Sequence, residues 1–274
     1  IVHDTPRTRI WFRQAEALVR AGDHGAAERV LRDYLRRHAR RQGRVREATL
    51  QLGLALVAQG KRRQAERQFE RCAAFRPRRA PEGSELAAAA HCRFQLGELE
   101  FDAYQRIALR PPMKRLTRLL SQKAARLKRA EALFTRVIQA GHPEWASAAL
   151  FRIGDMYAAF AKAIYDAPMP QGLSPRELEV YRQELQSLAF PIEDKALKAF
   201  TVSHRVALKH AYYSVWTRRT VERLRQLDPA RFPPEPEVRP ATRWADSFTD
   251  FGLALERRKP PPLPPPAGAA EEAE

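Results

Sequence analysis

The chain has 274 residues, of which 44% are hydrophobic, so it can build a packed core as one elongated domain or two compact ones. No stretch approaches the roughly 18 apolar residues of a membrane-spanning helix, so we expect no transmembrane segment. The formal net charge is +17, and residues 1–79 hold 20 Lys and Arg against 8 Asp and Glu. This excess indicates either an ordinary solvated basic face or an acidic partner, which would be a protein, an anionic lipid surface or nucleic acid. The sequence begins with Ile1, so we expect a processed or truncated chain. Removal of a signal peptide or of a lipid anchor is one explanation for such a start.

Ala, Leu, Arg, Glu and Gln are abundant, and all five are good helix formers. Residues 46–79 have the pattern of two antiparallel helices. Gly53 and Ala65 are small enough to let the helices approach closely, and Gly60 turns the chain between them. Phe69 is placed to fill the seam. This segment therefore predicts a helical hairpin.

A second, less regular hairpin is predicted over residues 8–40. Its small and apolar residues fall at the same relative places: Ala15, Leu18, Gly22, Ala27, Leu31 and Tyr34. The two hairpins together occupy residues 1–79.

Longer and less regular helices are expected in residues 80–229. One starts near Ser84 and is broken around Pro111, and the next runs over about 114–140. A further helix is expected over residues 145–164.

Ser174 and Glu177 form a capping box that opens a helix to about Leu188. Pro191 is expected to end it and to restart another, and the last helix runs from Tyr213 to Leu227.

The C-terminal region has a different composition. Residues 230–258 are predicted to be a Pro-rich linker followed by a short helix with an apolar stripe of Trp244, Phe248, Phe251 and Leu255. Residues 259–274 are rich in Pro and then in Ala and Glu, so we expect a disordered tail.

The spacing in the 46–79 hairpin resembles that of a tetratricopeptide repeat (TPR). The residues that carry the resemblance are Leu52, Gly53, Leu56, Gly60, Ala65, Phe69 and Pro77. The resemblance implies an all-α fold, a TPR-like right-handed helical solenoid with insertions.

A narrower resemblance covers residues 131–240. It is carried by Glu144-Trp145-Ala146, Phe151-Arg152-Ile153-Gly154, the segment 167–173, Glu179 to Tyr181, Pro191 to Ala196, and Trp216-Thr217. These segments resemble a module of envelope TPR proteins of myxobacteria and related δ-proteobacteria, including gliding-motility (Glt-type) components. The resemblance implies a periplasmic or outer-membrane-associated scaffold in a multiprotein complex, with a cytoplasmic location as the alternative.

The sequence offers no constellation typical of catalysis, of a cofactor or of a metal site. The seven His residues form no metal-binding pair at helical spacing, and no Gly-rich phosphate loop is present. Glu98 and Glu100 are two residues apart and diverge on a helix, so they do not make an acid–base pair. We therefore predict that the protein is not an enzyme.

Two surfaces are candidates for binding. In a stack of repeats the first helices line a concave groove, here with Phe12, Glu16, Leu50, Leu54, Val57, Phe151 and Asp155. Such a groove receives an amphipathic helix or an extended peptide of a partner, or else the chain's own helix around Trp244.

The second candidate is a basic stripe of arginines at helical spacing: Arg29, Arg32, Arg36 and Arg40, then Arg63, Arg67 and Arg71. The groove predicts a protein-binding scaffold. The stripe predicts, as the alternative function, a module that binds nucleic acid or an anionic surface, although few aromatic residues accompany it.

Cys72 and Cys92 have no metal-ligand spacing and fall on apolar helix faces. We favour two buried free thiols. The alternative is a disulfide between adjacent helices, which requires an oxidising compartment.

Overall fold

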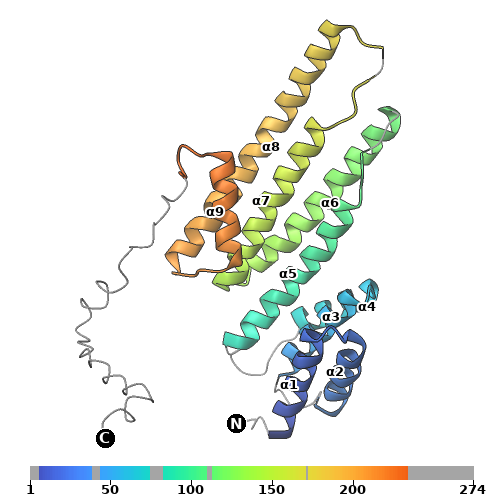
Figure 1. Cartoon of the computed structure of the whole chain (residues 1–274), viewed down its shortest axis with the longest axis vertical. Coiled ribbons are helices and arrows are strands. Elements are labelled where there is room, and N and C mark those ends of the chain that lie inside the picture. The colour runs from blue at the N-terminus through green and yellow to red at the C-terminus, as the bar shows by residue number, and fades with distance from the viewer. Residues whose placement is uncertain (1–5, 39–43, 75–82, 110–112, 171, 234–274) are drawn as a thin grey trace, which may run out of the picture. The chain divides into compact units, whose positions relative to one another are not determined.

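The computed structural model describes residues 6–38, 44–74, 83–109, 113–170 and 172–233 (Figure 1). Within these ranges the chain forms helices joined by turns and loops and contains no strand, which confirms the all-α prediction. The helices are α1 (Pro6–Arg20), α2 (His24–His38), α3 (Val45–Ala58), α4 (Arg62–Ala74), α5 (Gly83–Gln105), α6 (Met113–Gln139), α7 (Pro143–Tyr165), α8 (Pro175–Lys209) and α9 (Val215–Leu227). No helix in the described ranges has the length and apolarity needed to cross a membrane.

The chain divides into two units, residues 1–233 and residues 234–274. Apart from residues 230–233, the expected linker, the helix around Trp244 and the tail fall in the second unit, outside the described residues. Pro77 and Arg40 also lie outside them.

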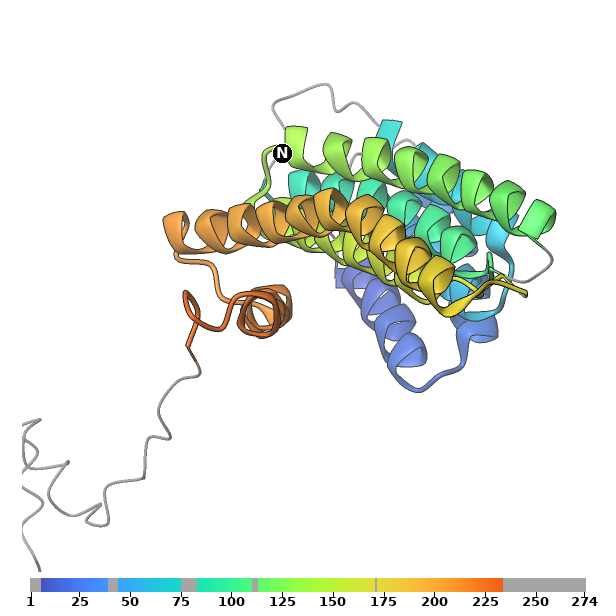
Figure 2. The same ribbon diagram turned by 90° about the horizontal axis from the view of Figure 1, so that it is seen from above.

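The helices of the first unit pack as consecutive pairs: α1 with α2, α3 with α4, α5 with α6, and α7 with α8, while α9 lies against α7 and α8. The turns inside the first two pairs contain Gly22 and Gly60, with φ of 80° and 74°. Only glycine adopts this left-handed conformation without strain, so the predicted turn positions are confirmed. Figure 2 shows α5, α6, α7 and α8 running side by side.

The two helices of each pair pack together through the same arrangement of buried residues. The second helix always carries an Ala and, four residues later, a large apolar residue, and all of them are at most 1% exposed: Ala27 and Leu31, Ala65 and Phe69, Ala130 and Phe134, Ala196 and Phe200. In the last three pairs the aromatic ring lies against a glycine of the first helix. A Cβ on Gly97 would lie 2.5 Å from Cε1 of Phe134, and one on Gly154 would lie 2.7 Å from Cε1 of Phe200. Glycine is therefore required for these helices to approach so closely.

In the described ranges the first helices of neighbouring pairs contact each other, whereas the second helices do not pack against each other. The first helices touch one another in succession, α1 with α3, α3 with α5 and α5 with α7, and α7 also touches α9. Among the described residues the backbones of the second helices, α2 and α4 for example, do not pack against each other, and α2 reaches α4 only through long side chains such as Arg32, which bonds Gln64. A gap is left between neighbouring second helices, with a first helix beneath it.

One predicted boundary is wrong. The helix that Ser174 caps continues through Pro191 to Lys209 as the single helix α8. A proline removes one intrahelical hydrogen bond, that to the carbonyl of Ser187, but Ser187 and Pro191 are exposed, where water can hydrate the carbonyl. On the inner face, residues on both sides of the proline pack against α7, with Ala189 fully buried. This packing holds the helix together.

Cys72 of α4 and Cys92 of α5 form a disulfide, with their Cα atoms 6.1 Å apart. Both residues are buried, as the apolar faces predicted. The preferred expectation of two free thiols is therefore wrong. Their burial on facing helices at a distance suited to a bond explains the pairing.

Candidate binding pocket

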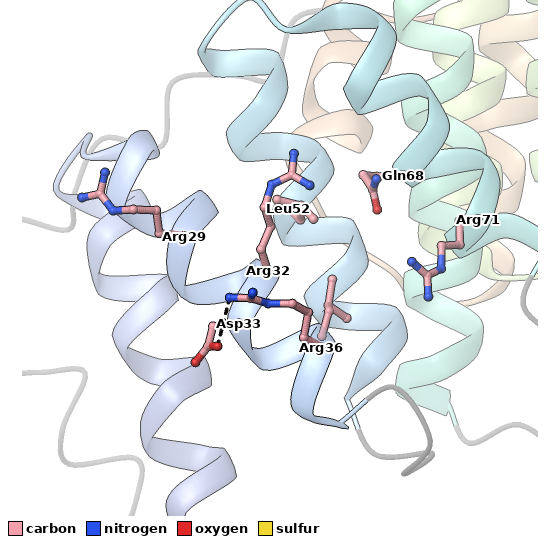
Figure 3. A pocket seen from close by; sticks show the side chains of 8 residues that line it. Arg29, Arg32, Asp33, Arg36, Leu52, Gln68 and Arg71 are labelled. Carbon is pink, nitrogen blue, oxygen red and sulfur yellow. Dashed lines mark hydrogen bonds and ion pairs between the residues drawn. The ribbon is translucent and has the colours of Figure 1, made fainter.

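A hollow of about 730 Å³ opens in the gap between α2 and α4 (Figure 3). We call it the arginine pocket. It is lined by Arg29, Arg32, Asp33, Leu35 and Arg36 of α2, by Leu52 of α3, and by Gln68 and Arg71 of α4. Leu35 and Leu52 are buried, so the pocket has an apolar floor.

The helical period explains the α2 wall of the pocket. Arg29, Arg32 and Arg36 are three and four residues apart, so their side chains share one face of the helix. Gln68 and Arg71 share a face of α4 in the same way. Because the backbones of α2 and α4 stay apart, both faces border the same space.

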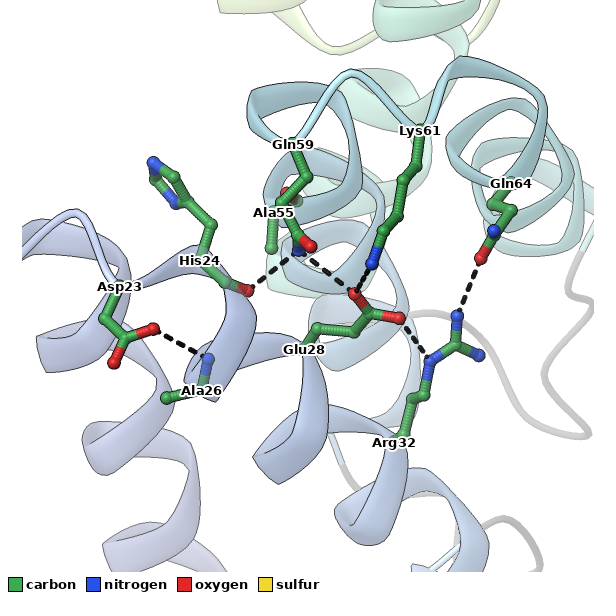
Figure 4. A network of polar contacts seen from close by, with 9 residues as sticks. All are labelled: Asp23, His24, Ala26, Glu28, Arg32, Ala55, Gln59, Lys61 and Gln64. Atoms are coloured by element: carbon green, nitrogen blue, oxygen red, sulfur yellow. Dashed lines mark hydrogen bonds and ion pairs between the residues drawn. The ribbon is translucent and has the colours of Figure 1, made fainter.

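A carboxylate network orients one of these arginines (Figure 4). Glu28 accepts hydrogen bonds from Lys61 Nζ at 2.7 Å, from Arg32 Nε at 2.8 Å and from Gln59 Nε2 at 3.1 Å. The bond from Lys61 is the largest cause of a Glu28 pKa that is lowered from 4.5 to about 2. Arg32 also donates from Nη2 to Gln64 Oε1 at 3.0 Å. Its guanidinium is thus held in place before any ligand binds.

The other arginines that line the pocket form fewer hydrogen bonds and ion pairs than Arg32 does. Asp33 forms ion pairs with both Arg36, at 3.3 Å, and Arg37, at 3.0 Å, so its single charge is shared between two arginines. Arg29 and Arg71 have no hydrogen bond or ion pair within the described part of the chain. The pocket therefore presents two free guanidinium groups on opposite walls and an excess of positive charge.

The predicted basic stripe is only partly assembled in this pocket. Arg29, Arg32 and Arg36 line it together with Arg71. Arg63 and Arg67 are exposed on α4 but do not line it. Leu35, Leu52 and Gln68 were not predicted to line a site, because their place in the pocket depends on the gap between α2 and α4.

The predicted concave groove does not have the expected apolar surface. Phe12, Leu50 and Phe151 are buried in the core. Leu54 is half-buried against the first core cluster, and Glu16 is half-buried on α1, while 36% of Val57 is exposed. Phe12, Leu50 and Phe151 fill the interior and are not available to a partner.

Asp155, the last of the groove residues, belongs to a charged cluster around Arg152. Arg152 donates two hydrogen bonds to the Glu98 carboxylate, at 2.8 and 2.7 Å, and Arg223 donates to Asp155 at 2.7 Å. The Arg152 guanidinium also lies 5.1 Å from the ring centroid of Trp216. A hollow of about 280 Å³ beside this cluster includes Phe151 and Asp155 in its lining.

The ion pairs of this cluster join α7 to α5 and to α9, and its carboxylates are not paired with each other as acid–base chemistry would need. Burial raises the pKa of Glu98, and the neighbouring Arg152 opposes that effect. Glu100 bonds a different arginine, Arg126, at 2.9 Å, so the two glutamates diverge as their spacing predicted. Among the described residues, no three His, Cys, Asp or Glu side chains gather in a way that could hold a metal ion.

No model of a known protein family, no curated protein and no solved structure matches this chain.

Proposed function

We propose that this protein is a non-catalytic scaffold that binds an acidic segment of a partner protein in the arginine pocket. The observation that carries the proposal is a pair of arginines without a partner among the described residues, Arg29 of α2 and Arg71 of α4, that line one pocket with an apolar floor. Arginine binds carboxylates through two parallel hydrogen bonds. A segment with acidic side chains for the walls and an apolar side chain for Leu35 and Leu52 matches this chemistry.

The lining favours a peptide over nucleic acid. No aromatic side chain lines the pocket, so bases would have no ring on which to stack. The floor of Leu35 and Leu52 would remain unused by a phosphate backbone, whereas an aliphatic side chain would cover it.

The repeated seams support the scaffold class. The Ala and large apolar residue of each second helix, and the glycine opposite three of them, recur from pair to pair as in TPR-like repeats with insertions. Repeats of this kind present extended surfaces to other proteins.

We place the scaffold in the periplasm or at the outer membrane, in a cell-envelope machine such as that of gliding motility. The Cys72–Cys92 disulfide supports an oxidising compartment, since cytosolic thiols are kept reduced. The gliding machine is suggested by the sequence resemblance in residues 131–240. Trapping of free thiols in intact cells tests the compartment, and we expect neither cysteine to react.

The test of the pocket is affinity capture from a cell-envelope extract with Arg29→Glu/Arg71→Glu and with Arg205→Glu/Lys209→Glu as a matched control. Both double variants reverse two exposed charges, but only the first alters the pocket. We expect a protein partner that the wild type and the control retain and the pocket variant loses, with affinity for the purified partner reduced by roughly tenfold or more. A partner retained equally by all three proteins would contradict the proposal.

Nucleic-acid binding is the second candidate, favoured by the net charge of +17 and by the exposed arginines. It predicts gel shifts with DNA or RNA and an affinity that falls steeply with salt. On a duplex, the logarithm of the binding constant should fall against the logarithm of the salt concentration with a slope of about 0.9 for each phosphate contacted. Retention of a protein partner at high salt, with no nucleic-acid shift, would exclude it.

A further inference from the structure

A second positive surface lies far along the chain from the arginine pocket. Residues 195–221 contain six Lys and Arg and two His but no Asp or Glu. They form the C-terminal half of α8, the turn that follows it and the first part of α9. The arginine pocket takes nothing from this region.

The helical period separates this half of α8 into two faces. Ala196, Phe200, Ser203 and Ala207 are buried. Val202, Arg205, Leu208 and Lys209 are exposed on the other side. Among the described helices α8 touches only α7 and α9, so this outer face has no helix upon it.

The turn between α8 and α9 extends the exposed surface. Ala211, with φ of 48°, lies at the tight turn, where its N–H donates to the carbonyl of Leu208. Tyr213 and Val215 follow at once and are 76% and 45% exposed. Figure 1 shows this turn at the end of α8, next to the start of α9.

Lys198 forms an ion pair with Asp194, which directly precedes this region, but the two basic residues on the outer face of α8 are uncompensated in the described part of the chain. Arg205 and Lys209 have no ion pair or hydrogen bond within the described residues. Arg218 reaches Glu222 only at 3.8 Å, with both side chains mostly exposed, and so exposed a pair neutralises little.

We infer that this α8–α9 surface (Val202, Arg205, Leu208, Lys209, Tyr213 and Val215) binds the headgroups of an anionic lipid bilayer. Basic side chains attract the anionic headgroups, and isolated aliphatic side chains enter the boundary between headgroups and acyl chains. Tyrosine is favoured at that boundary because its ring is apolar and its hydroxyl polar. Val202, Leu208 and Val215 distinguish the surface from a nucleic-acid site, since aliphatic side chains offer no platform for bases.

The test is co-sedimentation of the full chain with vesicles of phosphatidylcholine alone and with vesicles that also contain phosphatidylglycerol. We expect binding to the anionic vesicles only, weakened by salt. Arg205→Gln/Lys209→Gln is expected to lower the partition coefficient by roughly thirtyfold, because each basic residue near an anionic surface contributes about a factor of five. Leu208→Ser/Tyr213→Ser is expected to weaken binding while leaving its salt dependence unchanged.

The matched control is Arg29→Gln/Arg71→Gln, which removes two charges from the arginine pocket. It should bind vesicles as the wild type does, so failure of this inference is distinguishable from failure of the proposed function. Equal binding to neutral vesicles would overturn the inference. So would vesicle binding that is lost in the control but kept in Arg205→Gln/Lys209→Gln, or binding to DNA with none to vesicles.

Discussion

Glu28 links the first two helix pairs through one carboxylate. It lies on α2, and Lys61 and Gln59 come from the turn between α3 and α4. The same carboxylate orients Arg32 at the pocket wall. One side chain therefore contributes both to packing between pairs and to the shape of the candidate site.

Replacing this carboxylate by an amide predicts a stability loss that depends on pH. Glu28→Gln should lower the free energy of unfolding by roughly 1–2 kcal/mol at about pH 7, since hydrogen bonds to a charged group are lost. The Glu28 pKa is about 2 in the folded protein against 4.5 ordinarily. The wild-type advantage is therefore present above about pH 4.5 and disappears as pH falls toward 2.

Urea unfolding of both proteins at about pH 7 and about pH 3 measures this difference. A gap between wild type and Glu28→Gln that does not narrow at low pH would contradict the pKa assignment. The sequence did not reveal this network, because Glu28 and Lys61 are 33 residues apart and meet only when the pairs pack.

Each of the last three helix pairs depends on one glycine lying beneath one aromatic ring. The contact lets the two helices approach more closely than any other residue at that position would allow. An alanine there gains helix propensity, worth about 1 kcal/mol, but its methyl group occupies the space of the ring. The second effect should win, because overpacking a core costs about 1–3 kcal/mol.

Gly97→Ala is accordingly expected to destabilise the protein by about 1–2 kcal/mol in urea unfolding. The control is Gly25→Ala in α2, where the nearest atom to a new Cβ would be Asp23 Oδ1 at 3.7 Å, an ordinary contact. That control should be neutral or stabilising through helix propensity. Equal effects of the two substitutions would show that the ring contact at Gly97 does not limit the packing.

Features that depend on residues close together in the sequence were predicted, whereas features that depend on contacts between separate helices were not. Helix type, the turns at Gly22 and Gly60, and the cap at Ser174 are determined within a few residues, and the sequence predicted them. The break at Pro191 was wrong, because packing against α7 outweighs the local preference of proline. The arginine pocket was predicted only as stripes of arginines on two successive helical hairpins, and its apolar floor was missed because it depends on how α2, α3 and α4 pack.

Two of the clusters that make up the core of residues 1–233 share α5. Cys92 and Leu99 of α5 belong to the cluster that contains α1–α4, whereas Phe94 and Phe101 belong to the cluster with α6 and α7. Helix α5 thus connects the N-terminal pairs to the longer ones. The disulfide to Cys72 secures α4 to this connecting helix.

Reduction of the disulfide should therefore lower both the free energy of unfolding and the affinity of the arginine pocket for its partner. The bond joins residues 20 apart, and a loop of that length is worth about 3 kcal/mol through the unfolded state. Arg71 directly precedes Cys72, so releasing α4 also loosens one wall of the arginine pocket. Urea unfolding and partner affinity with and without reductant measure both effects. Cys72→Ala/Cys92→Ala should resemble the reduced protein and be insensitive to reductant, whereas an unchanged midpoint on reduction would show that α4 is held by packing alone.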